Sequence, residues 1–122
     1  AVNAIVHAHP TVASAFCASG RSINTKLIAE SYAILDIPVR APYACMGTPA
    51  LAENVARAAA RGAVVLMDNH GVLTTGRGLL EAFDRLEVLE KAAEITLLAG
   101  HLNDEREISP AELRALDHLK VR

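Results

Sequence analysis

Aromatic residues are scarce in this chain of 122 residues, which has no tryptophan, two tyrosines and two phenylalanines. Aromatic side chains usually supply a large part of the buried area of a core. The core must therefore be built from alanine, valine, leucine and isoleucine, with close contact between elements. The chain is long enough to bury such a core, and we expect one domain over residues 1–122.

Three other features that the sequence lacks exclude nucleic-acid-binding, membrane-spanning and disulfide-rich proteins: a basic patch, a long apolar run and a set of cysteines. Lysines and arginines are scattered and the formal net charge is −2, so nothing indicates binding to nucleic acid or to an anionic membrane. No apolar run approaches the roughly 20 residues of a membrane span, and no secretory signal is visible, so we expect a cytoplasmic protein. Two cysteines cannot form a disulfide framework, and we expect Cys17 and Cys45 to be reduced thiols in or near the core.

Hydrophobic periodicity and turn residues predict an α/β chain. Strands are expected at 3–9, 63–67 and 72–76, and the last two should form a hairpin around the turn 68–71. Helices are expected at 11–18, 24–35, 49–60 and 79–99, with Gly100 as the end of the longest one. A short last helix should follow the capping box at 109–112. Pro38 and Pro42 restrict the segment between them to an extended strand or a loop.

Two histidines spaced two positions apart carry the first chemical signal. His7 and His9 belong to the strand expected at 3–9, and residues i and i+2 of a strand point to the same face. The spacing therefore places two imidazoles side by side. On its own, however, an H-x-H pattern more often consists of surface or hydrogen-bonded histidines than of metal ligands.

A third histidine strengthens the metal interpretation. His70 lies in the expected turn 68–71, and a turn that ends a central strand can bring one side chain over the face of a neighbouring strand. Three neutral imidazoles suit Zn²⁺, with bonds of about 2.0–2.1 Å, and leave one position open for a substrate. His7, His9 and His70 are therefore the candidate metal ligands.

Several motifs follow one another along the chain: His7-Ala8-His9-Pro10, Ala41-Pro42-Tyr43-Ala44 with Gly47-Thr48, Asn69-His70-Gly71-Val72-Leu73 and the long Glu-rich helix that follows. Their order resembles the class II aldolase/adducin family over nearly the whole chain, and matches the C-terminal two-thirds of that family's domain. The 61 positions from His9 to His70 fit the aldolase branch better than the epimerase branch, where this interval is longer.

The resemblance implies a fold, a cofactor and an activity. The fold would have three layers, α/β/α, around a mostly antiparallel sheet. The three histidines would bind a divalent metal ion, usually Zn²⁺, which stabilises an enediolate while a carbon–carbon bond of a sugar phosphate is made or broken. Cleavage would release dihydroxyacetone phosphate and a short aldehyde without a Schiff-base lysine. The family also implies a homo-oligomer, often a homotetramer with its sites at subunit interfaces.

The chain departs from the family pattern in two ways. The acid/base glutamate and the phosphate-binding residues of the family lie upstream of the H-x-H, so we expect the catalytic glutamate before residue 1 and an N-terminally incomplete domain. Neither Glu30 nor Glu53 matches the catalytic position, which leaves the catalytic residues of this chain unknown. Ile28 stands where the aldolase has a tyrosine contributed by a neighbouring subunit, and Tyr32, one helical turn away, is not assigned that role.

Three functions remain open at this point. The preferred one is a metal-dependent aldolase-type lyase, and the second is a sugar-phosphate 4-epimerase or related decarboxylase with the same metal chemistry. The third is a non-catalytic, adducin-like interaction domain, against which the three retained histidines argue. We expect Asn69 to orient the His70 turn. Helix capping explains Thr48, and loop packing explains Tyr43.

Overall fold

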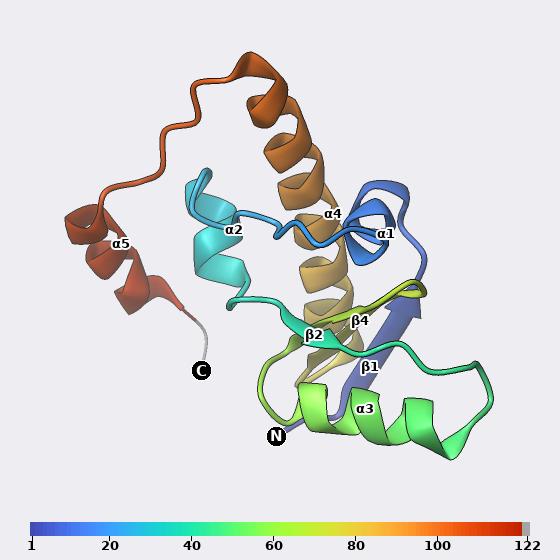
Figure 1. Cartoon of the computed structure of the whole chain (residues 1–122). Coiled ribbons are helices and arrows are strands. Elements are labelled where there is room, and N and C mark those ends of the chain that lie inside the picture. The colour runs from blue at the N-terminus through green and yellow to red at the C-terminus, as the bar shows by residue number, and fades with distance from the viewer. Residues whose placement is uncertain (121–122) are drawn as a thin grey trace.

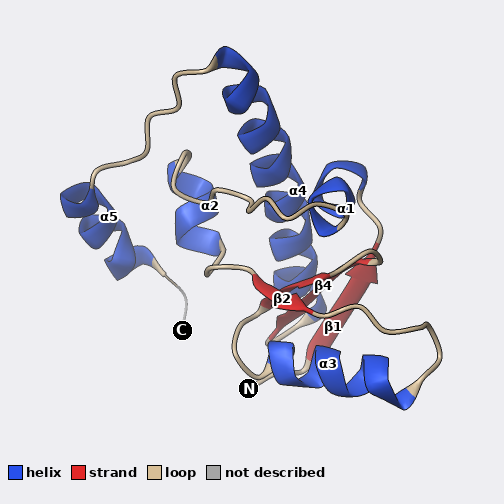
Figure 2. Cartoon of the chain, in the orientation of Figure 1, coloured by secondary structure: helices blue, strands red, loops and turns tan. Residues whose placement is uncertain are grey.

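A four-stranded sheet lies between two layers of helices in the computed structural model, which describes residues 1–120 (Figures 1 and 2). The strands are β1 (Ala4–Ala8), β2 (Val39–Ala41), β3 (Val64–Met67) and β4 (Gly71–Gly76). Their spatial order is β1-β4-β3-β2, so the first strand of the chain forms one edge of the sheet and pairs with the last. No helix within residues 1–120 combines the length and the apolar character needed to cross a membrane.

The sheet is mixed rather than purely antiparallel. Strand β4 pairs antiparallel with both β1 and β3, as the expected hairpin and the mostly antiparallel sheet require. Strand β2 pairs parallel with β3, and this edge was not predicted beyond an extended segment between two prolines. A strand flanked by Pro38 and Pro42 suits an edge, because proline cannot donate a ladder hydrogen bond.

Residues 1–120 contain five α-helices, of which α1, α3 and α4 pack on the sheet. Two of them begin as the sequence predicts: the Thr48 hydroxyl accepts a hydrogen bond from the Leu51 N–H at 3.4 Å, and the Ser109 hydroxyl accepts one from the Glu112 N–H at 3.3 Å. The helices are α1 (Thr11–Cys17), α2 (Ala29–Ile34), α3 (Pro49–Ala59), α4 (Leu79–Leu102) and α5 (Pro110–Leu116), followed by a 3₁₀ turn, η1 (Asp117–Leu119).

Two predicted helix boundaries are wrong. The helix expected at 24–35 forms only as α2, because the Asn24 side chain accepts a hydrogen bond from the Lys26 N–H at 2.9 Å and holds a turn there instead. Helix α4 runs through Gly100, where the chain was expected to leave the helix. It ends at Asn103, whose φ of 60° gives the left-handed conformation that closes many helices.

Strand β3 separates the two halves of the core. Val64 and Leu66 face one way, into a cluster with residues of α1 and α4. Val65 and Met67 face the other way, into a smaller cluster beneath α3. Burial on both faces explains the continuous apolar run of this strand, since each fully buried aliphatic side chain contributes about 1.5–3 kcal/mol.

The helical cover of the sheet is uneven. Helix α4 packs on β4 and β1, whereas α3 packs on β2 and β3. The outer face of β1 therefore stays open: Ile5 is 61% exposed, and His7 on the same face is exposed too. This open face, beside the β3–β4 turn, is where the candidate metal ligands lie.

Candidate metal centre

His7 is placed by the β1–β4 ladder. It pairs with Leu73 of β4, and its neighbours Val6 and Ala8 turn toward the helical side of the sheet. Its Nδ1 lies 2.8 Å from the backbone oxygen of Val72. A carbonyl oxygen only accepts hydrogen bonds, so Nδ1 carries the proton and Nε2 keeps its free lone pair. This arrangement fixes the ring of a metal-binding histidine in one tautomer and one orientation.

His9 follows the last ladder pair, Ala8–Val72, and its ring lies against Gly71. A Cβ atom at position 71 would stand 2.5 Å from His9 Cδ2 and 2.7 Å from the backbone oxygen of Ala8. Both distances are far inside van der Waals contact. The ring can therefore occupy its place only because residue 71 has no side chain.

His70 is held by the tight turn between β3 and β4. The His70 N–H donates to the Met67 oxygen at 3.0 Å, and Asn69 at the apex has a φ of 57°. The Asn69 N–H donates to the Cys17 oxygen at 2.9 Å, which ties the turn to the end of α1. Asparagine tolerates the left-handed region better than most residues, so the turn depends on this side-chain type.

The turn is braced from outside as well. Asp68 forms an ion pair with Arg40 of β2 at 2.9 Å, and its N–H donates to the Ala41 oxygen at 3.0 Å. The thiol of Cys17 donates to the Gly71 oxygen at 3.2 Å. Contacts from β2 and α1 thus fix the turn that carries the His70 side chain.

Together the three histidines form a site that fits a metal ion. One ring nitrogen from each lies within 4.8 Å of the others, and the ring centroids are 5.0, 5.1 and 5.3 Å apart. Tetrahedral zinc holds its nitrogen ligands roughly 3.3–3.4 Å apart, so the rings need only short rotations to reach that spacing. Two of the rings are exposed and the third is half-buried, which leaves the remaining coordination position open to solvent.

The electrostatics of the cluster favour neutral imidazoles. Burial of the His70 ring, and then the neighbouring charges of His7 and His9, hold the pKa of His70 below its usual value. A histidine must be neutral to bind a metal, so a lowered pKa makes the ring available over a wider pH range.

The other residues singled out in the sequence lie outside this cluster. His101 and His118 are exposed, as are Tyr43 and Cys45, so the prediction that both cysteines lie in or near the core is wrong for Cys45. Cys45 follows the proline-flanked strand β2 in a connection that lies on the surface. Glu30 and Glu53 are also exposed on their helices. Asn69 acts through its backbone in the turn, and a role for its side chain toward His70 stays a prediction.

The structure adds site residues that the sequence did not indicate. The carboxylate of Glu90, on α4, accepts hydrogen bonds from the N–H groups of Val12 and Ala13, just after His9. Gly71 and the Val72 carbonyl complete the support of the two strand histidines. The Asn-His-Gly turn gave a partial signal for Gly71. Nothing in the periodicity of α4 distinguishes Glu90 from its other glutamates.

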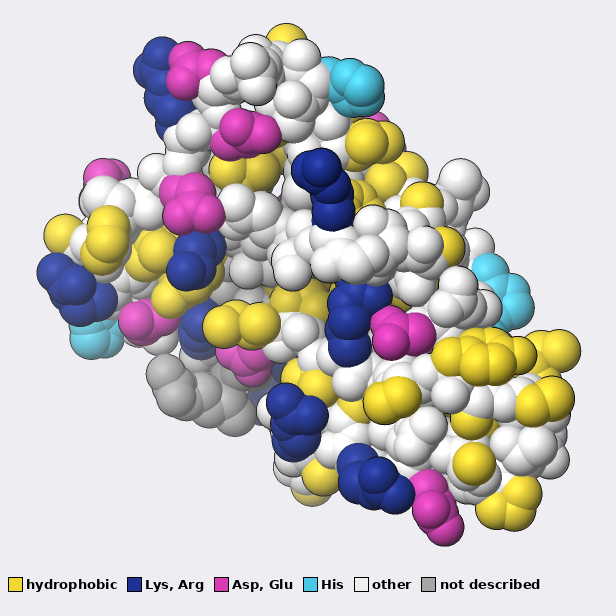
Figure 3. All heavy atoms as spheres, viewed as in Figure 1, with side chains coloured by type: hydrophobic (Ala, Val, Ile, Leu, Met, Phe, Trp, Pro, Cys, Tyr) yellow, Lys and Arg dark blue, Asp and Glu magenta, His cyan; other side chains and the backbone are white. Residues whose placement is uncertain are grey.

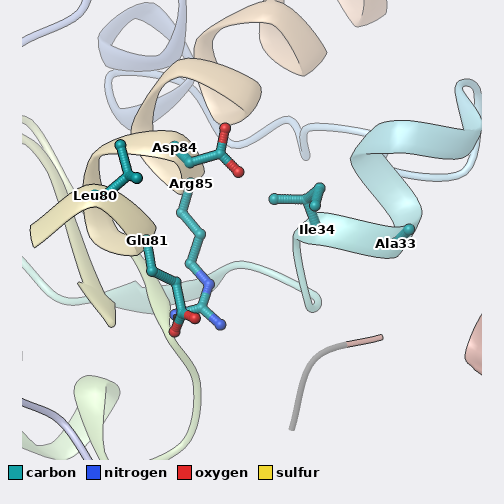
Figure 4. Close-up of a pocket in the computed structure, with 6 residues that line it drawn as sticks. All are labelled: Ala33, Ile34, Leu80, Glu81, Asp84 and Arg85. Carbon is teal, nitrogen blue, oxygen red and sulfur yellow. Dashed lines mark ion pairs between the residues drawn. The ribbon is translucent and has the colours of Figure 1, made fainter. Parts of the chain in front are cut away.

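A separate cavity of about 520 Å³ lies between α2 and the start of α4 (Figure 4). It contains no histidine, and its lining is mostly apolar apart from Glu81, Asp84 and Arg85. Glu81 pairs with Arg85 at 3.1 Å and with Arg77 at 2.8 Å, so these cations compensate its charge. The histidine cluster, and not this cavity, is therefore the candidate for metal binding.

Comparison with known proteins agrees with this geometry. Residues 1–97 match the family model described as Class II Aldolase and Adducin N-terminal domain. An L-fuculose phosphate aldolase of Methanococcus maripaludis strain C7 is 30% identical over 106 residues, covering 83% of this chain and 54% of that protein. A 3-oxo-tetronate 4-phosphate decarboxylase of Pectobacterium atrosepticum is 33% identical over 102 residues, covering 80% and 46%.

Solved structures give the same result for the fold. A structure of L-fuculose 1-phosphate aldolase superposes with a TM-score of 0.83 at 30% identity, over 96% of this chain and 55% of that chain. The predicted α/β fold of this type is therefore confirmed. The chain spans about half the length of the curated relatives it matches.

Proposed function

The chain belongs to the class II aldolase and adducin family, and from that premise we propose that it supplies the metal-binding part of an aldolase-type lyase acting on a sugar phosphate. The observation that carries the proposal is the cluster of His7, His9 and His70, whose ligand atoms lie within 4.8 Å of one another. Zn²⁺ is the proposed ion, because three imidazoles with an open fourth position are typical of catalytic zinc.

The residues of the chain have defined tasks in this proposal. A bound divalent ion would act as a Lewis acid that polarises a substrate carbonyl and stabilises the enediolate charge. His7 presents Nε2 because its Nδ1–H donates to the Val72 carbonyl. The lowered pKa of His70 favours its neutral form, and the exposed side of the cluster would admit the substrate. Cleavage would yield dihydroxyacetone phosphate and a short aldehyde.

The acid/base group is proposed to be a glutamate before residue 1, together with the phosphate-binding residues, so that residues 1–122 form one incomplete domain of this family. Glu30 and Glu53 stay outside the proposal, since both are exposed on helices away from the histidine strand. A cytoplasmic location also stays a prediction.

A homo-oligomer, with four subunits as the preferred number, is part of the proposal. Hydrophobic side chains gather at the lower right of the surface in Figure 3, over the β2–α3 connection and α3. Tyr43 is 59% exposed there and Met46 is 72% exposed. Exposed apolar surface of this kind supports association between subunits.

A decarboxylase is the second candidate. A 3-oxo-tetronate 4-phosphate decarboxylase of Haemophilus influenzae is 43% identical over 54 residues, which cover 44% of this chain. Coverage does not separate the two candidates, because the Methanococcus maripaludis aldolase matches 83% of the chain at 30% identity and the Pectobacterium atrosepticum decarboxylase matches 80% at 33%. The aldolase stays the preferred proposal, and product assays decide between them. The two reactions differ in the second product: aldol cleavage releases an aldehyde beside dihydroxyacetone phosphate, whereas decarboxylation of a 3-oxo-tetronate 4-phosphate releases carbon dioxide beside the same ketone phosphate.

Metal content tests the metal centre. We expect about one Zn²⁺ per purified wild-type chain by inductively coupled plasma mass spectrometry, and loss of it in His7→Ala, His9→Ala and His70→Ala. His101→Ala and His118→Ala are matched controls and should keep the metal, because both histidines are exposed and lie outside the cluster. A wild-type chain that binds no divalent ion stoichiometrically would remove the basis of the proposed function.

Product assays test the reaction. If the acid/base glutamate lies before residue 1, these 122 residues should bind metal but show little turnover, and turnover should appear when an upstream segment is supplied. Aldehyde release from a ketose 1-phosphate supports the aldolase, whereas carbon dioxide release from a 3-oxo-tetronate 4-phosphate supports the decarboxylase. Robust cleavage by the 122 residues alone would show that the proton-transfer group lies within them.

A further inference from the structure

Helix α1 has no charged or capping residue of its own. Its sequence is Thr-Val-Ala-Ser-Ala-Phe-Cys, and it begins after Pro10, which has no side-chain acceptor. The first turn has no acidic residue and the last turn no basic one. A short helix of this kind leaves N–H groups unpaired at its start and carbonyl groups unpaired at its end, with partial positive and negative charge there.

A carboxylate from another helix accepts hydrogen bonds from the N–H groups at the start of α1. Glu90 of α4 accepts a hydrogen bond from the Val12 N–H at 3.0 Å through Oε2, and one from the Ala13 N–H at 2.7 Å through Oε1. Both oxygens are thus used on consecutive backbone donors of α1. Hydrogen bonds from N–H groups to an ionised carboxylate are stronger than those to neutral acceptors.

At the other end of α1, the unpaired carbonyl groups accept hydrogen bonds from β2 and from the β3–β4 turn. Arg40 of β2 donates from Nη2 to the Phe16 oxygen at 3.0 Å, and from Nη1 to Asp68 in the His70 turn at 2.9 Å. The Asn69 N–H donates to the Cys17 oxygen at 2.9 Å. The end of α1 is therefore attached directly to the turn that carries His70.

The start of α1 is equally close to a ligand. His9 precedes Pro10, and the β1–β4 ladder ends at Ala8, so ladder hydrogen bonds do not fix the backbone of His9. The position of His9 is therefore set by the β1–β4 ladder before it and by the start of α1 after it, which Glu90 holds through Val12 and Ala13. Helix α1 is therefore a brace of about 10 Å that connects His9 at one end to the His70 turn at the other.

We propose that Glu90 is a positioning residue of the metal centre, which locks the start of α1 and thereby holds His9 in place for metal binding. The inference rests on the proposed metal function, because it assigns Glu90 a task toward that same site. Glu90 does not contact the ion itself. It acts through the backbone of Val12 and Ala13, as the supporting groups around metal ligands do when their loss weakens binding by about 10–100-fold.

The test compares Zn²⁺ affinity among four proteins, measured by competition with a chromophoric chelator. In Glu90→Gln the amide keeps one acceptor and turns an N–H₂ toward a backbone donor, so we expect affinity to fall about tenfold. Glu94→Gln is the matched surface control, one turn along α4, where the carboxylate makes a 3.9 Å ion pair with Lys91. It should bind as the wild type does.

A second control separates positioning from loss of stability. Val88→Ala shortens a buried side chain of α4, in the core cluster that α4 shares with α1, and leaves the hydrogen bonds of Glu90 to Val12 and Ala13 in place. We expect it to lower the urea midpoint at least as much as Glu90→Gln while keeping its Zn²⁺ affinity within about twofold of the wild type. Backbone amide NMR should show the Val12 and Ala13 signals moved in Glu90→Gln and unmoved in Val88→Ala.

The outcomes are distinguishable. Weaker Zn²⁺ binding by Glu90→Gln alone supports the positioning role. Equal binding by Glu90→Gln and wild type, or an equal loss in Val88→Ala, overturns that role while leaving the metal centre intact. A wild-type chain without Zn²⁺ affinity overturns the proposed function and the role of Glu90 with it.

Discussion

Replacing Gly71 with alanine should damage the metal centre through one methyl group. The new Cβ would stand 2.7 Å from the Ala8 oxygen and 2.5 Å from His9 Cδ2, where ordinary contact begins at 3.4 Å. The Ala8 oxygen belongs to the end of the β1–β4 ladder, so one strand must move by about 0.7 Å relative to the other. Overpacking of this size costs about 1–3 kcal/mol of unfolding free energy.

The same displacement should weaken metal binding more than stability alone explains. Ligand distances in metal sites are held within about 0.2 Å, so a shift of His9 by several times that amount leaves the cluster with two well-placed imidazoles. We expect Gly71→Ala to lower Zn²⁺ affinity by at least tenfold. The measurement is chelator competition, with urea unfolding followed by circular dichroism for the stability.

Gly76→Ala is the matched control for this prediction. Its Cβ would meet the Ala82 nitrogen at 2.7 Å, a comparable backbone clash at the opposite end of β4 from the histidines. This variant should lose similar stability and keep its Zn²⁺ affinity. If Gly71→Ala binds Zn²⁺ as tightly as Gly76→Ala does, the close packing of the His9 ring on Gly71 is not what positions that ligand.

Two further predictions concern titrating groups. Burial raises the pKa of the Cys17 thiol, whereas Cys45 is exposed. Iodoacetamide at pH 8 should therefore alkylate Cys45 and leave Cys17 unmodified until urea unfolds the chain, which peptide mass spectrometry can measure. Equal labelling of both cysteines would contradict the buried position of Cys17. Hydrogen bonds from Arg77 lower the pKa of Glu81 to about 2, so this contact stabilises the fold above the ordinary carboxyl pKa and is lost as pH falls toward 2. Carboxyl NMR should show that Arg77→Ala raises the Glu81 pKa toward 4.5, and an unchanged titration would refute the assignment.

Local patterns predicted the elements whose ends depend on local chemistry. Thr48-Pro49 and Ser109-Pro110 begin helices as expected, and the apolar run at 63–67 and the turn after it form the predicted hairpin. One of the two boundary errors involves a distant partner. The Asn24 N–H is bound by the Thr96 hydroxyl at 3.0 Å, and this long-range contact, which no local pattern contains, adds to the local Asn24–Lys26 hydrogen bond in holding the segment in a turn.

The candidate site also has a part that local patterns predict and a part that depends on distant contacts. The same-face placement of His7 and His9 follows from strand periodicity, whereas the approach of His70 depends on β1 pairing with β4 rather than with another strand. The family resemblance grouped the three histidines as ligands, but it did not specify that pairing. Glu90 could not be found by either route, because its partners are backbone N–H groups on a helix far away in the sequence.

The position of β1 at the sheet edge also bears on the order in which the chain assembles. His70 lies in a hairpin of sequence neighbours, whereas His7 and His9 reach it only when β1 closes a loop of roughly 60 residues onto β4. Local pairings cost less chain entropy than long-range ones, so we expect the hairpin with His70 to form before β1 brings His7 and His9 to it. An ion bound by all three rings would cross-link the two ends of this loop. For a loop of this length, such a cross-link lowers the chain entropy of the unfolded state and so stabilises the fold by about 4 kcal/mol.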